Sequence, residues 1–207
     1  MNTLNPDSTA LLVVHLQHDI VSPGTAFGAL FSPEVLSCNI LANCHSAMRA
    51  VREAGGLVVP LRIAFAHDYA DLDESVPLLQ LAKEAGCLKE GSEGTAIVPE
   101  IGVLDQDVVV THHLPGPFSR SLLNELLKSR GIENVVVCGV ATNASVEGAV
   151  RQAADLGYTT YILSDASSAA DESAHQASVA SMALFARVIT LPKLRASLLA
   201  APGKSEQ

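Results

Sequence analysis

The sequence has few cysteines, few basic residues and no long apolar segment, and each shortage argues against a class of protein. Four cysteines among 207 residues, with no CxxC pair, do not make a disulfide framework. Only 13 Lys and Arg face 22 Asp and Glu, and this net charge of −9 argues against nucleic acid or an anionic membrane as partner. No apolar run approaches about 20 residues, and no basic N-terminal segment precedes an apolar stretch. We therefore expect a soluble, unexported protein of the cytoplasm.

The residues that are present favour one well-packed domain. Hydrophobic residues make up 48% of the chain and charged residues 17%, so a large core is available and disorder is not expected. A length of 207 residues suits a single α/β domain. We find no internal repeat and no linker, so the predicted domain spans residues 1–207, with short polar tails at about 1–8 and 202–207.

Short apolar runs alternate along the chain with segments of helical periodicity. The runs predict strands at 10–15, 57–63, 107–111, 134–138, 158–163 and 188–191. The periodic segments predict helices at 34–53, 77–84, 119–129, 144–157, 172–185 and 193–200. Continuously apolar strands that are each followed by a helix indicate an α/β fold with a parallel sheet covered on both faces.

The segment from Glu133 to Gly157 has the strongest functional pattern. It predicts a buried strand, a sharp turn at Gly139 and a helix, with Thr142 and Asn143 as possible N-caps. Ser145 then lies in the first helical turn, where unpaired N–H groups and the helix dipole favour negative charge. This is a suitable place for a nucleophile whose reaction develops an oxyanion, although a serine here can also simply help to start the helix.

Histidines gather where the predicted strands end. In parallel sheets ligands bind beyond the carboxyl ends of the strands, so these positions define a candidate crevice. The irregular segment 64–100 is long enough to cover such a site. Five of the seven histidines lie at strand ends or in the loops that follow: His15, His18, His67, His112 and His113.

Three segments of the sequence resemble the isochorismatase-like hydrolases, also called the cysteine hydrolase superfamily. They are ALLVVHLQHDIVSPG, DVVVTHHLPGPF and GVATNASVEGAVRQAADLGYTTYILSDASSA, and the likeness runs from about residue 10 to 191. The resemblance implies a doubly wound three-layer α/β/α domain with a six-stranded parallel sheet, in a homodimer or homotetramer. It implies hydrolysis of a small molecule without a cofactor, and a cis peptide near Val140–Ala141.

The same resemblance exposes three departures from the family pattern. The family's Asp after the first strand, Lys after the middle strand and nucleophilic Cys are replaced by His15, His112 and Ser145. These three residues are the catalytic candidates. The surrounding family positions supply the candidates for substrate binding, which are Gln17, Asp19, Phe118, Val140, Ala141, Thr142 and Asn143.

The altered trio is compatible with several kinds of chemistry. A serine hydroxyl needs a base to become a nucleophile, and an imidazole suits that role near neutral pH. His15 or His112 can therefore activate Ser145 toward a small amide-like or ester-like substrate, with Asp19 orienting a histidine and N–H groups near Val146 holding the oxyanion.

Three alternatives remain open. Joint loss of the family's acid, cation and nucleophile suits a small-molecule-binding pseudoenzyme. The clustered histidines suit a zinc or iron site, although no HxH or HExxH spacing is present, and we assign none of these residues as a metal ligand. The third alternative is a cofactor-free lyase or isomerase that uses the histidines for proton transfer.

Overall fold

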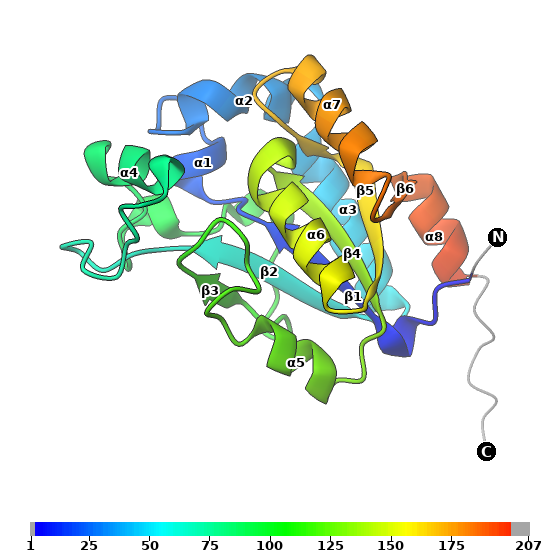
Figure 1. Ribbon diagram of the computed structural model, residues 1–207. Helices are drawn as coiled ribbons and strands as arrows, with labels where there is room; N and C mark the ends of the chain where they lie inside the picture. The colour runs from blue at the N-terminus through cyan, green and yellow to red at the C-terminus, as the bar shows by residue number, and fades with distance from the viewer. Residues whose placement is uncertain (1–2, 200–207) are drawn as a thin grey trace.

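The computed structural model describes residues 3–199, which form a six-stranded parallel sheet between two layers of helices (Figure 1). Every strand pairing is parallel, and the strand order is β3-β2-β1-β4-β5-β6. This arrangement confirms the predicted fold class. The strands are β1 (Thr9–Val14), β2 (Leu57–Ile63), β3 (Val110–His112), β4 (Asn134–Val140), β5 (Thr159–Ser168) and β6 (Arg187–Ile189).

Helices follow the strands along the chain and cover both faces of the sheet. The α-helices are α1 (His18–Val21), α2 (Gly28–Ser37), α3 (Ile40–Glu53), α4 (Pro77–Glu84), α5 (Leu123–Ser129), α6 (Glu147–Asp155), α7 (Glu172–Met182) and α8 (Leu191–Leu199). A π-helical turn, Thr142–Val146, leads into α6, and short 3-10 turns occupy Pro6–Ser8, Glu93–Thr95 and Pro99–Ile101. None of the helices within residues 3–199 combines the length and apolarity needed to cross a membrane.

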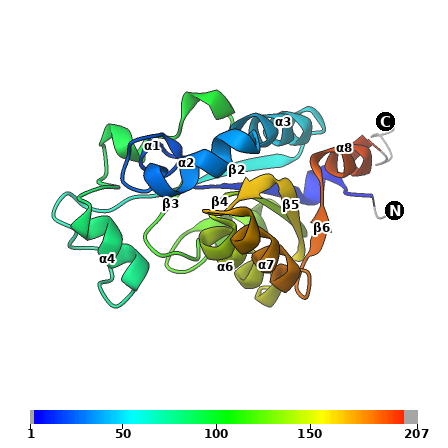
Figure 2. The same cartoon turned by 90° about the horizontal axis from the view of Figure 1, so that it is seen from above.

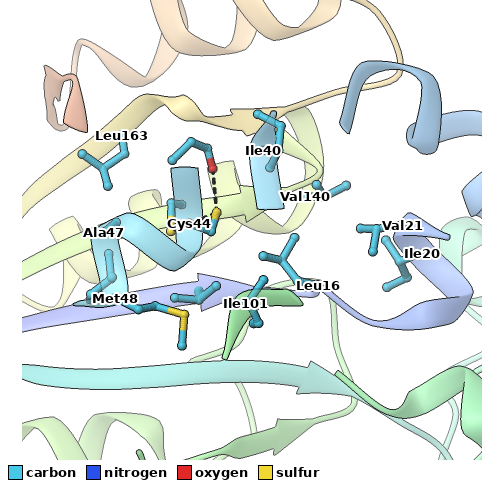
Figure 3. Packing of buried hydrophobic residues seen from close by; sticks show 14 of the residues in the cluster. Leu16, Ile20, Val21, Ile40, Cys44, Ala47, Met48, Ile101, Val140 and Leu163 are labelled. Atoms are coloured by element: carbon cyan, nitrogen blue, oxygen red, sulfur yellow. Dashed lines mark hydrogen bonds between the residues drawn. The ribbon is translucent and has the colours of Figure 1, made fainter. Parts of the chain in front are cut away.

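Two apolar cores hold the layers together, one on each face of the sheet. Viewed from above, α1, α2, α3 and α8 lie on one side of the sheet and α6 and α7 on the other (Figure 2). Figure 3 shows the first core, where Cys44 and Met48 of α3 pack over the sheet and the Cys44 thiol donates to a carbonyl of β5. Continuous burial of β1 on both faces explains its unbroken apolar sequence.

The order of the strands reverses at the centre of the sheet, between β1 and β4. The chain winds outward from β1 through β2 to β3, and then from β4 through β5 to β6. In doubly wound sheets the crevice at this reversal, beyond the carboxyl ends of the strands, is the usual ligand site. His15 follows β1 directly, and the turn that carries Ser145 follows β4.

The helix predicted over residues 34–53 is wrong as a single element. The structure divides it into α2 and α3 at Asn39, which adopts a left-handed conformation with φ of 53°. Asparagine tolerates this conformation better than most residues, and the apolar periodicity alone does not reveal the break. The expected N-caps also differ, since neither Thr142 nor Asn143 caps a helix and Ala141 occupies the cap position without a side-chain bond.

Several other boundaries also differ from the prediction, among them the starts of β3 at Val110 and of α5 at Leu123. Strand β5 continues to Ser168, beyond the expected end at residue 163, because it resumes pairing with the end of β4 after a register shift. Leu4 falls within the expected polar tail, yet it is buried and its N–H donates to the carbonyl of Ser197. The tail expected at 202–207 lies outside the described residues.

Candidate active site

His15 is placed at the crevice by an unusual backbone conformation immediately after β1. Its φ is 52°, in the left-handed region that few residues other than glycine adopt, and its N–H donates to the carbonyl of Leu61 at 3.0 Å. Only 4% of the residue is exposed. A strained backbone that is held by the surrounding structure is common at functional positions.

His112, the last residue of β3, meets His15 across the end of β2. The two Nε2 atoms are 2.9 Å apart, the ring centroids are 4.8 Å apart and the ring planes differ by 24°, so the rings meet end to end. The Nδ1 atom of His112 lies 2.8 Å from the carbonyl oxygen of Leu114. His112 is fully buried and does not line the cleft described below, so the structure brings together the two imidazoles but keeps the second one behind the first.

These contacts fix where the protons of the two imidazoles lie. A carbonyl oxygen only accepts, so Nδ1–H of His112 donates to Leu114, and the neutral ring then has a lone pair on Nε2. His15 must therefore donate its Nε2–H to His112. The remaining nitrogen of His15, Nδ1, has a lone pair and is available as a proton acceptor.

Burial keeps both imidazoles neutral. Desolvation lowers the pKa of His112 from 6.5 to about 4, with the Leu114 carbonyl opposing the shift and His113 adding to it. Desolvation also lowers the pKa of His15 well below 6.5, and the neighbouring His112 contributes in the same direction. His15 is therefore unprotonated across the neutral range, but it is a weak base.

This burial predicts a loss of stability in acid. An unfolded His112 takes up a proton as the pH falls below 6.5, whereas the folded one does not until about pH 4, so the free energy of unfolding falls across that window. We expect His112 alone to account for about 3 kcal/mol of this loss. Urea unfolding at pH 7.5 and pH 4 measures it, and His112→Asn is expected to flatten the dependence. A control, His67→Asn, removes an exposed imidazole, and an equal flattening of the pH dependence in that variant would contradict the assignment to His112.

Ser145 lies in the π-helical turn that follows β4. A cis peptide between Val140 and Ala141, at the position implied by the family resemblance, precedes this turn. The hydroxyl of Ser145, a residue that is 4% exposed, makes no hydrogen bond to any residue within 3–199, including His15. The N–H groups of Ala144 and Val146 both donate to the carbonyl of Ala141, so the oxyanion donor expected at Val146 is already engaged.

His15 and Ser145 line the same cleft, which contains about 480 Å³ of empty space. They supply its only polar side chains among the described residues, because every other lining residue is apolar. Phe27 and Phe31 form part of the wall, and α4 contributes Leu78, Leu79 and Ala82. The cleft therefore suits an uncharged apolar molecule placed beside an imidazole and a hydroxyl.

Three of the residues expected to bind substrate have structural partners instead. The Gln17 amide is fully buried, donates to the carbonyls of Ile63 and Thr95 and accepts from the Ile63 N–H. The Asp19 carboxylate accepts from the N–H of Leu88, so it supports the cleft wall and does not orient His15. Phe118 packs in the second core beside Tyr158. None of the three lines the cleft.

The other candidates lie in or beside the π-helical turn Thr142–Val146. Val140 and Ala141 line the cleft, whereas the side chain of Asn143 is exposed. Thr142 is buried, and its Oγ1 lies 2.8 Å from Nδ1 of His175 in α7. Thr142 therefore connects the turn to α7 and does not line the cleft.

Sequence reasoning missed most of the apolar wall of the cleft. The helix at 77–84 was expected within a long segment suited to covering a site, and its pattern of Leu78, Leu79 and Ala82 was the available signal. The acceptor at Leu114 is a backbone carbonyl, and no sequence pattern identifies it.

The histidines do not assemble into a metal site. Within the part of the chain that the structure describes, no group of three or more His, Cys, Asp or Glu side chains is arranged to hold a metal ion. His18 contacts the hydroxyl of Ser22, and His113 contacts the carbonyl of Ala64. His67 is exposed.

Comparison with known proteins agrees with this architecture. The family model described as the isochorismatase domain matches residues 9–193. The isochorismatase family protein YwoC of Bacillus subtilis (strain 168) is 34% identical over 181 residues, which are 86% of this chain and 88% of YwoC.

Solved structures show the same fold. A cysteine hydrolase from Pseudomonas syringae pv. phaseolicola 1448A superposes with a TM-score of 0.87 at 22% identity, over 98% of this chain and 97% of that one. An isochorismatase family protein from Burkholderia thailandensis superposes with a TM-score of 0.78 at 27% identity, over 97% of this chain and all of that one. The chain thus belongs to the isochorismatase family, within the isochorismatase-like hydrolase (cysteine hydrolase) superfamily.

Proposed function

We propose that this protein hydrolyses small, uncharged ester-like or amide-like substrates, with Ser145 as nucleophile and His15 as general base. The observation that carries the proposal is the hydrogen-bond chain from His15 through His112 to the Leu114 carbonyl. It leaves the lone pair of His15 on Nδ1, and His15 shares one cleft with Ser145.

The proton path follows from this arrangement. Oγ of Ser145 attacks the substrate carbonyl carbon while its proton passes to Nδ1 of His15. The protonated imidazole then gives that proton to the leaving alcohol or amine, and an acyl-serine forms. A water molecule that loses its proton to His15 attacks the ester, and proton return to Oγ regenerates the serine. The absence of a Ser145–His15 hydrogen bond among the described residues requires the pair to close when substrate binds.

His112 has a positioning role in this scheme. It is buried behind His15 and does not line the cleft, but its Nε2 accepts a hydrogen bond from Nε2–H of His15 and so keeps the lone pair of His15 on Nδ1. In a serine–histidine–carboxylate triad the third group is negatively charged and stabilises the imidazolium. A neutral His112 orients the ring without that charge, so we expect slow turnover and faster hydrolysis of esters than of amides.

The lining of the cleft indicates the substrate class. No Lys, Arg, Asp or Glu lies among its lining residues, so a carboxylate or ammonium group would lose its hydration without gaining a partner. An uncharged substrate buries its apolar body against Phe27, Phe31 and α4 at no such cost.

A matched substrate panel tests the proposal. We expect kcat/KM for p-nitrophenyl butyrate to exceed that for p-nitrophenyl hemisuccinate, which carries a carboxylate, by about tenfold or more, or about 1.4 kcal/mol. Phenyl butyrate and butyranilide extend the comparison to a less activated ester and an amide. Turnover indistinguishable from buffer across the panel contradicts the proposal, and equal rates for the two nitrophenyl esters contradict the substrate class.

Binding without turnover is the second candidate function. It is favoured by one observation, which is that Ser145 makes no hydrogen bond to an imidazole in the described residues while the cleft is apolar and accessible. Calorimetry with butyranilide separates the two functions, because saturable binding with no hydrolysis supports the binding protein.

A further inference from the structure

A second cavity, whose lining residue His175 contacts Thr142 of the turn that carries Ser145, shares no lining residue with the cleft. It contains about 710 Å³ of empty space between the end of α2, the start of α3, the carboxyl half of β5 and the start of α7. Its polar lining includes Glu34, Asp165, Ser168, Glu172 and His175. Nothing in the proposed hydrolysis uses these side chains.

The charge of this second cavity has one sign. Glu34, Asp165 and Glu172 contribute carboxylates, and no Lys or Arg is among the lining residues. Both oxygens of Asp165 accept from the N–H of Leu191, so this carboxylate is held in place at the start of α8. Within residues 3–199, the carboxylate of Glu34 contacts the Cys38 thiol, that of Glu172 contacts the Gln176 amide, and neither contacts a Lys or Arg. The cavity therefore has negative charge that a cationic ligand would neutralise.

Ser168 provides an independent indication of a ligand. The residue is 3% exposed and lines the cavity, and its Oγ has no hydrogen-bond partner within residues 3–199. Among the described residues, this Oγ is the only buried side-chain nitrogen or oxygen that lacks a hydrogen-bond partner. An unpaired buried hydroxyl costs free energy, and a ligand with donors would satisfy it.

His175 lines the same cavity as Glu34 and Glu172 and connects it to the turn that carries Ser145. Burial lowers the pKa of His175, and the charges of Glu172 and Glu34 oppose that shift. Nδ1 of His175 contacts Oγ1 of Thr142, and the Ser178 hydroxyl donates to the Thr142 carbonyl. A molecule bound against His175 thus contacts the helix that holds the turn carrying Ser145.

We propose that this cavity binds a small organic amine, with its ammonium group between Glu34 and Glu172 and a donor directed to the Ser168 hydroxyl. An ammonium group offers three donors and one positive charge, which match the carboxylates and the unpaired oxygen. A metal ion fits less well, because no three of the His, Cys, Asp or Glu side chains in residues 3–199 converge on a point suited to coordination. The proposal does not depend on hydrolysis by Ser145.

Calorimetric titration of the full chain with 1,4-diaminobutane, and with 1,4-butanediol as its uncharged counterpart, tests the site. We expect the diamine to bind saturably with one molecule per chain and the diol not to bind. Raising NaCl from 0.05 to 0.5 M is expected to raise the Kd for the diamine several-fold, because salt screens the charges. Equal behaviour of diamine and diol, or no saturation of the diamine at about 10 mM, would overturn the proposal.

Variants locate the binding within the chain. Glu34→Gln and Glu172→Gln are each expected to raise the Kd for the diamine about fivefold, and Ser168→Ala is expected to raise it about threefold. Ser168→Ala should fold normally, because its hydroxyl has no partner to lose. The control is Glu125→Gln, which removes an exposed carboxylate from α5, a helix that contributes no residue to the cavity lining. Equal weakening by the control would show a general charge effect and overturn the assignment.

The His175 imidazole gives a readout that distant charge does not produce. Addition of the diamine is expected to shift the Cε1–H resonance of His175 while that of exposed His67 stays in place. Ser168→Ala should reduce the shift at a given diamine concentration. A diamine that binds without moving the His175 signal would place the site elsewhere on the protein and overturn the proposal.

Discussion

Replacement of Gly139 by alanine is expected to lower the free energy of unfolding by at least about 4 kcal/mol, which is a large fraction of the stability of a domain of this size. Gly139 lies in β4 opposite Val14 of β1, at the central strand pair of the sheet. Its φ is 118°, in a region that residues with a side chain avoid. A Cβ at this position would come within 2.2 Å of the carbonyl oxygen of Val14 and 2.7 Å of its nitrogen.

The clash is with backbone, so no rotation of a side chain can relieve it. Separating β1 from β4 would displace two residues that line the cleft, because His15 follows Val14 and Val140 follows Gly139. The same replacement therefore affects both the stability of the sheet and the placement of the site.

A second glycine isolates the steric effect from the conformational one. Gly131 also has a positive φ, of 64°, but a Cβ there would meet nothing within 4 Å. Gly131→Ala is expected to cost about 1 kcal/mol, the usual strain of a left-handed residue. Urea unfolding followed by circular dichroism compares the two variants. Failure of Gly139→Ala to fold agrees with the expectation, and a soluble variant within about 1 kcal/mol of Gly131→Ala contradicts it.

The sequence allowed the sheet to be predicted because its central strands, β1 and β4, are buried almost continuously on both faces. Strand β2 has the predicted bounds, and the α4 helix at 77–84 does as well. Predicted boundaries failed where tertiary contacts decide the backbone. Asn39 breaks a continuous apolar pattern between α2 and α3, and β5 extends to Ser168 only because the end of β4 lies beside it.

The candidate site was predictable in part for the same reason. Parallel strands end at one edge, so residues just after them gather there, and His15 and Ser145 do line one cleft. The separate places of His112 and Asp19 were not predictable, because they depend on a carbonyl at Leu114 and an N–H at Leu88. Backbone groups of this kind are present in every residue, and only the folded chain selects among them.

Replacement of Ser145 by alanine is expected to reduce kcat for p-nitrophenyl butyrate by about 10³-fold or more, with little change in KM. The variant removes the nucleophile but leaves the apolar wall of the cleft, so ground-state binding is retained. Initial rates over a range of substrate concentrations separate kcat from KM. Ser197→Ala is the matched control, because Ser197 is also a buried serine but belongs to α8, far from the cleft in sequence and absent from its lining.

The pH dependence and a second variant distinguish this mechanism from hydrolysis by a surface group. Because burial lowers the pKa of His15 well below 6.5, kcat/KM should be flat from about pH 6.5 to 8 and should fall only in more acidic solution. His112→Asn is expected to lower kcat more than it raises KM, since the ring of His15 loses the partner that orients it. A Ser145→Ala variant that keeps more than half of the wild-type kcat would remove Ser145 as nucleophile. An acid limb centred near pH 7 would show that a solvent-exposed imidazole, and not His15, acts as the base.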